Sequence, residues 1–146
     1  MIRVQKKDFD ISEEIASLNR RNVGALASFV RLVRDDNPEI SAMTLEHYPG
    51  MTEKKLAEIE AEARNRWHLE DCLIIHRYGR LEPGDNIVMV IVASRHRKSA
   101  LEACAFLIDW LKTSAPFWKY EERREGADWV KARTTDEIAS KKWEIS

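Results

Sequence analysis

Hydrophobic residues along the chain follow two different spacings, which separate predicted strands from predicted helices. Short runs that alternate or are rich in β-branched residues indicate strands. These strands are predicted around residues 2–4, 23–33, 41–47, 72–78 and 87–93, with a final pair in the segments FWKYEERR and ADWVKA. Pro83, Gly84 and Asp85 form a strong turn signal, so the strands at 72–78 and 87–93 are expected to form a hairpin.

Three helices are predicted from capping residues and helical spacing. Asp10, Thr52 and Ser94 each stand where a short polar side chain can cap the first turn of a helix. The helices that follow are expected at residues 15–20, 52–67 and 94–114. Pro116 ends the last of them, because a helix rarely continues into a proline.

The predicted elements follow one another in an irregular order, with no repeat and no linker rich in Gly, Ser or Pro. A chain of 146 residues has a normal length for one domain. We therefore expect a single α+β domain over residues 1–146, built from antiparallel strand pairs rather than regular βαβ units.

The composition limits the kind of partner. Hydrophobic residues make up 44% of the chain and charged residues 34%, which is typical of a protein with a packed core. The 24 basic and 25 acidic side chains nearly cancel, so no overall positive field attracts nucleic acid or an anionic membrane. Any site for an anion must therefore be local.

Targeting and membrane signals are not evident in the sequence. The longest apolar stretches, 87–94 and 101–111, are shorter than the roughly 20 residues of a membrane span. The N-terminal segment MIRVQKKDFD contains charges before a signal region can form. We expect a cytoplasmic protein with neither nucleic acid nor a membrane as partner.

Motifs of common enzyme classes and of metal sites are absent. The chain has no GxGxxG, GxxxxGKS/T, HExxH or GxSxG segment. Cys72 and Cys104 are the only cysteines and form no CxxC pair, so neither a disulfide framework nor a structural zinc site is expected. We predict no metal and no bound cofactor, and interpret both cysteines as reduced core residues.

The segment SRHRK at residues 94–98 places three cations and an imidazole at the start of the third predicted helix. The helix dipole favours acidic residues at that end. Cations there are instead typical of a site that binds a phosphate or carboxylate together with unpaired backbone N–H groups. Some of these side chains must point to solvent or pair with acids, and we prefer His96 and Arg97 as anion ligands.

Three other cations stand beside predicted elements. Arg34 follows an apolar strand, Lys112 lies in the last helical turn, and Lys119 follows the apolar segment 116–118. Each has an ordinary explanation: a surface ion pair, a favourable interaction with the helix dipole, and the outer face of a strand. Spacing alone therefore favours a surface role for all three.

Four longer segments resemble a known family. MTLEHYPGMTEKKLAEI, HRYGRLEPGDNIV, ASRHRKSALEAC and FLIDWLKTSAPFWK are similar to segments of the large, catalytic subunit of molybdopterin synthase. They occur in the same order as in that family, and the similarity extends from about Val23 to Trp143. The resemblance implies an α/β-hammerhead-like fold with additional antiparallel strands.

The resemblance also implies a reaction and its partners. It implies a sulfurtransferase that inserts two sulfurs into cyclic pyranopterin monophosphate, which forms the dithiolene of molybdopterin in molybdenum cofactor biosynthesis. The sulfur would arrive as the C-terminal thiocarboxylate of a small ubiquitin-like subunit, whose tail enters a pocket of the large subunit. The implied assembly is a heterotetramer built around a homodimer of large subunits.

The same resemblance points to a basic pocket. Lys112 and Lys119 are its candidate catalytic residues, which would stabilise charge during acyl transfer and sulfur addition, with Lys112 as a candidate proton shuttle. The implied substrate-binding residues are Arg34, His96, Arg97, Lys112, Lys119 and Arg133. A phosphate and a thioacid carbonyl both require placed positive charge, which agrees with this mapping.

Helix geometry limits how one chain can build this pocket. Arg97 and Lys112 are 15 positions apart on one predicted helix, which corresponds to about 22 Å. One small substrate does not easily bridge that separation. If both residues serve one pocket, the simplest arrangement is a two-fold dimer in which His96 and Arg97 of one chain complete the Lys112 and Lys119 site of the other.

Departures from the family leave alternatives open. Arg31 stands where the family's FVGxVR segment has glycine, and Arg95 where a small residue often precedes the His-Arg pair. Arg31 either crowds the pocket or adds an anion contact. The first alternative function is a non-catalytic anion-binding scaffold or regulator that retains the fold. The second is persulfide transfer by the chain's own thiol, which rests only on Cys72 and Cys104.

Overall fold

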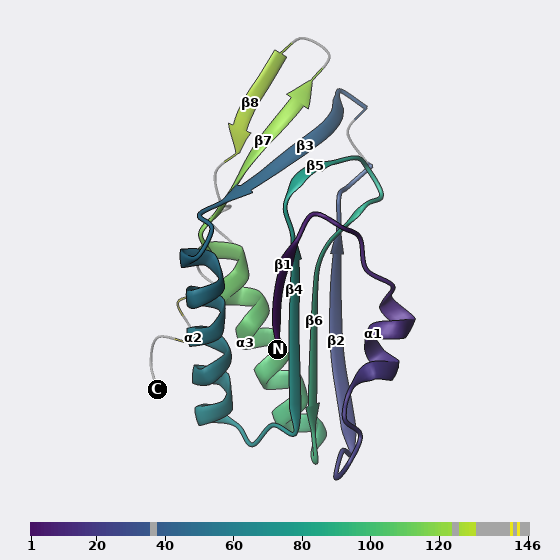
Figure 1. Ribbon diagram of the computed structural model, residues 1–146, viewed down its shortest axis with the longest axis vertical. Helices are drawn as coiled ribbons and strands as arrows, with labels where there is room; N and C mark the ends of the chain where they lie inside the picture. The colour runs from purple at the N-terminus through teal and green to yellow at the C-terminus, as the bar shows by residue number, and fades with distance from the viewer. Residues whose placement is uncertain (36–37, 124–125, 131–140, 142, 144–146) are drawn as a thin grey trace.

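Eight strands and three helices make up the part of the chain that the computed structural model describes, which is residues 1–35, 38–123, 126–130, 141 and 143. The strands are β1 (Ile2–Gln5), β2 (Ala25–Leu32), β3 (Ile40–His47), β4 (Asp71–Arg77), β5 (Gly79–Leu81), β6 (Asn86–Ser94), β7 (Phe117–Arg123) and β8 (Gly126–Val130). The helices are α1 (Ile11–Ser17), α2 (Met51–Arg66) and α3 (Arg97–Thr113). The strands form two sheets, in the orders β1-β4-β6-β2 and β5-β3-β7-β8 (Figure 1).

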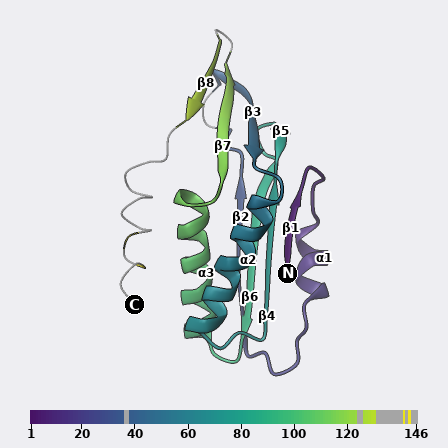
Figure 2. The same ribbon diagram turned by 60° about the vertical axis from the view of Figure 1, so that its left-hand side comes forward.

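The first sheet has helices on both of its faces. Helices α2 and α3 cover one face and α1 lies on the other (Figures 1 and 2). In β4, Cys72 and Ile74 belong to the core shared with α2 and α3, whereas Leu73 and Ile75 belong to the core beside α1. Because helices cover both faces of the sheet, its central strands β4 and β6 are apolar on both faces. None of the helices in the described part of the chain is long and apolar enough to cross a membrane.

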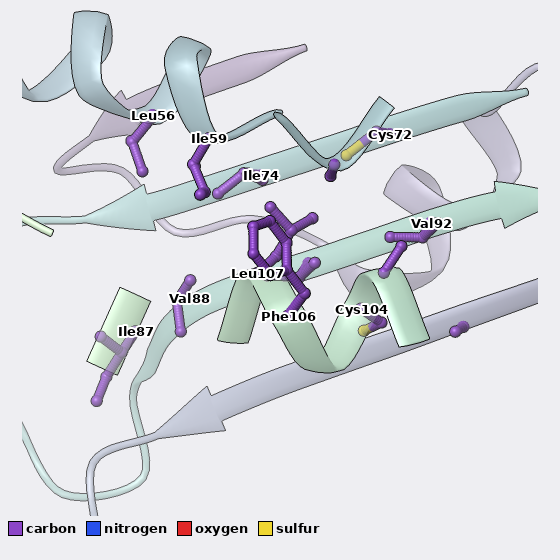
Figure 3. Packing of buried hydrophobic residues seen from close by; sticks show 14 of the residues in the cluster. Leu56, Ile59, Cys72, Ile74, Ile87, Val88, Val92, Cys104, Phe106 and Leu107 are labelled. Atoms are coloured by element: carbon purple, nitrogen blue, oxygen red, sulfur yellow. The ribbon is translucent and has the colours of Figure 1, made fainter. Parts of the chain in front are cut away.

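The larger core lies between the first sheet and helices α2 and α3. Figure 3 shows Leu56 of α2 and Leu107 of α3 on the same side of the sheet as Ile74 and Val88. Leu56, Ile74 and Leu107 are fully buried. Burial of one such aliphatic side chain stabilises the fold by about 1.5–3 kcal/mol, so this interface holds α3 firmly along the sheet.

The second sheet lies beyond one end of the first sheet (Figure 1). Its central strand β3 pairs antiparallel with β5 and with β7, and β7 pairs antiparallel with β8. Three residues separate the end of α3 from the start of β7. The C-terminal end of α3 therefore meets the second sheet, while its N-terminal end lies at the far end of the first sheet (Figures 1 and 2).

Most of the predicted architecture is confirmed. The protein has the α+β class, the strands β4 and β6 form the expected antiparallel pair, and β7 and β8 form the final pair. The predicted use of antiparallel pairs throughout is wrong at one position, because β1 pairs with β4 in parallel. The long connection between these two strands, which includes two helices, makes a parallel crossover possible. The turn region after β4 also contains β5, which the sequence did not predict.

All three helices begin at other residues than predicted. Helix α1 begins at Ile11, directly after its expected N-cap Asp10, whereas the expected caps of α2 and α3 have other partners. Gly50, with φ 86°, is the N-cap of α2, whereas the buried Thr52 hydroxyl donates to the Tyr48 carbonyl at 2.8 Å. Ser94 is the buried last residue of β6, and its hydroxyl donates to the His68 carbonyl at 2.9 Å. The third helix therefore begins at Arg97, with His96 as its N-cap.

Candidate functional site

Two half-buried lysines lie where α3 meets the second sheet. Lys112 is in the last turn of α3, and Lys119 is in β7, on the other side of the short turn at residues 114–116. Lys119 pairs with Leu45 of β3 and with Val130 of β8. Strand β7 is thus an interior strand, and hydrogen-bonded strands on both sides fix the backbone that carries Lys119.

A buried histidine lies against this junction. His76, near the end of β4, is 6% exposed, and its ring stacks on Phe117 with the centroids 3.6 Å apart and an interplanar angle of 12°. Phe117 and Lys119 are two positions apart on β7, so both side chains leave the same face of the strand. Sequence patterns do not single out His76, because it is followed by a second polar residue, Arg77, near the end of the otherwise apolar run 72–78.

The electrostatics around His76 show that positive charge gathers here. Burial lowers the pKa of His76 from 6.5 to about 4, and a hydrogen bond to the Arg77 carbonyl, 2.8 Å away, opposes this change. Arg31, His47 and Lys119 each lower the pKa further. The ring is therefore neutral near pH 7. The positive charges of Arg31 and Lys119 lie close enough to lower its pKa.

We expect acid to destabilise the protein partly through His76. Because its folded-state pKa lies below 6.5, the unfolded chain binds more protons between pH 6.5 and about pH 4. The resulting stabilisation is complete above pH 6.5, is lost as the pH falls toward 4, and is on the order of 3 kcal/mol. Urea unfolding at about pH 7 and about pH 4.5 should show a smaller loss of stability in His76→Gln than in the wild type.

The control for this experiment is His68→Gln, because the His68 side chain is 79% exposed. That variant should retain the wild-type dependence of stability on pH. An unchanged pH dependence in His76→Gln would contradict the assignment of a buried, neutral ring at this position.

Arg34 lies at the same end of the first sheet as the two lysines. It is exposed and follows the end of β2. The preceding residue, Val33, donates its N–H to the Asp85 carbonyl at 2.9 Å and accepts from the Gly84 N–H at 2.8 Å. These bonds join the segment to the turn before β6, on the side of the second sheet (Figure 1). The structure therefore brings Arg34 to the same end of the first sheet as Lys112 and Lys119.

His96 and Arg97 lie at the opposite end of the first sheet. Both are exposed, at the N-cap and the first residue of α3. Helix α3 is continuous from Arg97 to Thr113, so the 15 positions between Arg97 and Lys112 correspond to about 22 Å along its axis. One chain thus does not bring these residues together. Arg133, the remaining residue implied by the family resemblance, lies outside the described residues.

A shallow depression of about 280 Å³ adjoins the start of α3 and is lined by His68, Ser94, Arg95, His96 and Ser99. Near this depression, Glu70 Oε1 lies 3.0 Å from His68 Nε2 and forms an ion pair with Arg95, whose Nε is 3.7 Å away. One cation of the basic segment therefore pairs with an acid. Gly24 is required nearby, because a Cβ at that position would lie 2.1 Å from the Arg95 carbonyl oxygen.

Comparison with known proteins identifies the family. The sequence model of the MoaE protein family matches residues 4–114. The molybdopterin synthase catalytic subunits of Ralstonia nicotianae and Pseudomonas aeruginosa are 55% and 52% identical to this chain, over 99% and 98% of its length and 84% and 98% of theirs. The chain belongs to the MoaE family of molybdopterin synthase catalytic subunits. The solved MoaE protein of Burkholderia ambifaria has the same fold, with a TM-score of 0.84 and 52% identity over 99% of this chain and 98% of that one.

Membership of the MoaE family confirms the enzyme class that the resemblance implied, a sulfurtransferase of molybdenum cofactor biosynthesis. The family match at residues 4–114 includes Arg34, His96, Arg97 and Lys112, whereas the similarity to the two complete relatives extends over almost the whole chain. The lysine junction and the start of α3 therefore both belong to the part of the chain that is shared with MoaE proteins.

The cysteines of this MoaE chain are poorly suited to carry sulfur. Cys72 and Cys104 are both free and buried. Burial raises the pKa of Cys72 to about 12 and that of Cys104 to about 11. The thiolate is the reactive form of cysteine, so both groups remain protonated thiols near pH 7. This observation argues against persulfide transfer by the chain's own thiol.

Proposed function

We propose that this chain transfers sulfur to cyclic pyranopterin monophosphate from the C-terminal thiocarboxylate of a small ubiquitin-like partner subunit, which forms the molybdopterin dithiolene. The observation that carries the proposal is the junction of α3 and β7. It holds Lys112 and Lys119 half-buried at the end of the first sheet that also carries Arg34. Cations fixed by a helix end and an interior strand are suited to substrates that carry a phosphate and a thioacid.

The lysines stabilise negative charge during the transfer. Each transfer forms a carbon–sulfur bond on the pterin side chain in place of a carbon–oxygen bond, whose oxygen leaves as water or stays on the phosphate as its ring opens. It also breaks the bond between sulfur and the carrier's acyl carbon. Water supplies the oxygen that converts the carrier's terminus to a carboxylate. Negative charge develops on the acyl oxygen in the course of this exchange, and Lys119 and Lys112 are placed to stabilise it. Lys112, at the end of α3, is our candidate for the proton shuttle.

The site is shared between two copies of the chain. His96 and Arg97 lie about 22 Å along α3 from Lys112, too far to act on one small substrate within one chain. In a two-fold dimer the start of α3 of one copy completes the lysine junction of the other, and each dimer holds two equivalent sites. With one carrier subunit for each site, the assembly is a heterotetramer.

The protein acts as one domain in the cytoplasm. Support comes from its two free cysteines, since reduced thiols are the rule in that compartment. One continuous core joins α2, α3 and the first sheet, with members from Ala27 to Leu107. A single core of this kind is typical of one domain.

Reconstitution tests the proposed function. The purified chain is mixed with thiocarboxylated carrier and cyclic pyranopterin monophosphate, and dithiolene formation is measured. We expect product with this carrier and none with a carrier that ends in an ordinary carboxylate. Absence of product at high enzyme concentration would support a non-catalytic scaffold instead.

A further inference from the structure

The side chain of Arg31 leaves the same face of the first sheet as His76. Arg31 of β2 pairs with Val88 of β6, and Val88 pairs with His76 of β4. Residues directly opposite one another on neighbouring strands share a face of the sheet. Val88 belongs to the core beneath α2 and α3, so Arg31 lies on the face that α3 covers.

This row of residues lies at the end of the sheet where α3 stops. The β2–β6 pairing becomes irregular directly after Arg31, and β6 begins at Asn86, two residues before Val88. Phe117, which follows α3, stacks on His76, the member of this row that β4 contributes. Arg31 is therefore at the lysine junction and not under the body of the helix.

The electrostatics of His76 agree with this placement of Arg31. The charges of Arg31 and Lys119 both act on His76 and lower its pKa. The Arg31 side chain is half-buried. Both residues therefore add positive charge beside the same neutral ring, and an anion bound there would be attracted by both cations.

From this placement we infer that Arg31 is an additional anion-binding residue of the pocket, which contacts the phosphate of the pterin substrate. The inference rests on the proposed function. A phosphate dianion gains more from an added cation than a single carboxylate does, and the guanidinium group can donate two parallel hydrogen bonds to it. Arg31 stands where the resembling FVGxVR segment has glycine, so this chain holds the phosphate with one more cation.

The test uses the complete complex with the carrier and the variants Arg31→Gly, Arg31→Gln and Arg31→Lys. We expect the glycine and glutamine variants to raise the KM for the pterin substrate about tenfold, which corresponds to about 1.4 kcal/mol. The kcat and the KM for the carrier should change less than about threefold, because the lysines that stabilise charge remain. Arg31→Lys keeps the charge but not the two parallel donors, so it should restore only part of the affinity. Thermal unfolding verifies that each variant is folded.

The control is Arg21→Gln, which removes an exposed arginine outside the sheets and should leave every constant unchanged. An unchanged KM for the pterin in Arg31→Gln would overturn the inference. A higher KM for the carrier alone would also overturn it, because Arg31 would then contact the carrier's carboxylate. A sharp rise of kcat in Arg31→Gly would show instead that Arg31 obstructs the pocket.

A second readout separates this inference from the proposed function. Titration of the complex with inorganic phosphate, followed by calorimetry, measures anion binding without turnover. Weaker phosphate binding in Arg31→Gln, together with an inactive wild type, would mean that the anion site exists and the proposed reaction is wrong. Equal phosphate binding in the wild type and Arg31→Gln, together with an active wild type, would mean that the proposed reaction is right and that Arg31 does not bind the anion.

Discussion

Replacement of Lys119 by alanine is expected to reduce dithiolene formation by about 10²- to 10³-fold, the usual effect of removing one group that stabilises charge in a transition state. Strand β7 has β3 and β8 on its two sides, so the Lys119 ammonium acts from a fixed backbone. The loss should be in kcat more than in KM, because charge develops during transfer. Single-turnover kinetics with saturating carrier measures it.

Two comparisons make the Lys119 result specific. Lys119→Arg retains the charge with a different shape and should keep more activity than the alanine variant. Lys55→Ala is the matched control, because Lys55 lies on α2 with a half-exposed side chain and pairs with Glu58 at 3.5 Å. Turnover in Lys119→Ala within threefold of the wild type, with the fold intact, would remove Lys119 from the catalytic residues.

Mixing two inactive variants is expected to restore activity. Arg97→Ala removes a residue at the start of α3, and Lys112→Ala removes one at its end, about 22 Å away. In a mixed dimer, one shared site lacks both residues and the other has both intact. Random exchange of equal amounts makes half of the dimers mixed, so about a quarter of the wild-type number of sites should be active.

Subunit exchange must be verified for this complementation to be informative. Native mass spectrometry of two copies with different tags shows whether mixed dimers form. Mixed dimers without activity would contradict the shared site, and so would an active complex that contains a single large subunit. The control is a mixture of Lys112→Ala with Lys119→Ala, which should stay inactive because both changes fall on the same half of the site.

Local sequence patterns selected candidate residues at the start of α3 but not the two lysines near its end. Cations at the start of a helix conflict with the helix dipole, and that local conflict selected His96 and Arg97 without any knowledge of the fold. Lys112 and Lys119 carry no such conflict, because a lysine is ordinary both at a helix end and on a strand. Their half-burial arises only when α3 and β7 meet at the turn of residues 114–116.

Features that depend on partners far along the chain could not be predicted. The parallel pairing of β1 with β4 and the short strand β5 both require sheet neighbours that local patterns do not specify. The placement of His76 at the lysine junction depends on Phe117, which is 41 positions later in the chain and stacks on the His76 ring. The Ser94 hydroxyl forms a tertiary bond to the His68 carbonyl in place of the predicted cap, because a buried hydroxyl must find a partner wherever the fold provides one.

The fate of the carrier's sulfur tests the central claim most directly. A complex of this chain with carrier labelled by a heavy sulfur isotope in its thiocarboxylate is given cyclic pyranopterin monophosphate, and product and carrier are analysed by mass spectrometry. Our account predicts that the dithiolene contains two labelled sulfurs and that two carriers become carboxylates for each product. Unlabelled sulfur in the product, or carriers that lose sulfur without forming the dithiolene, would contradict it.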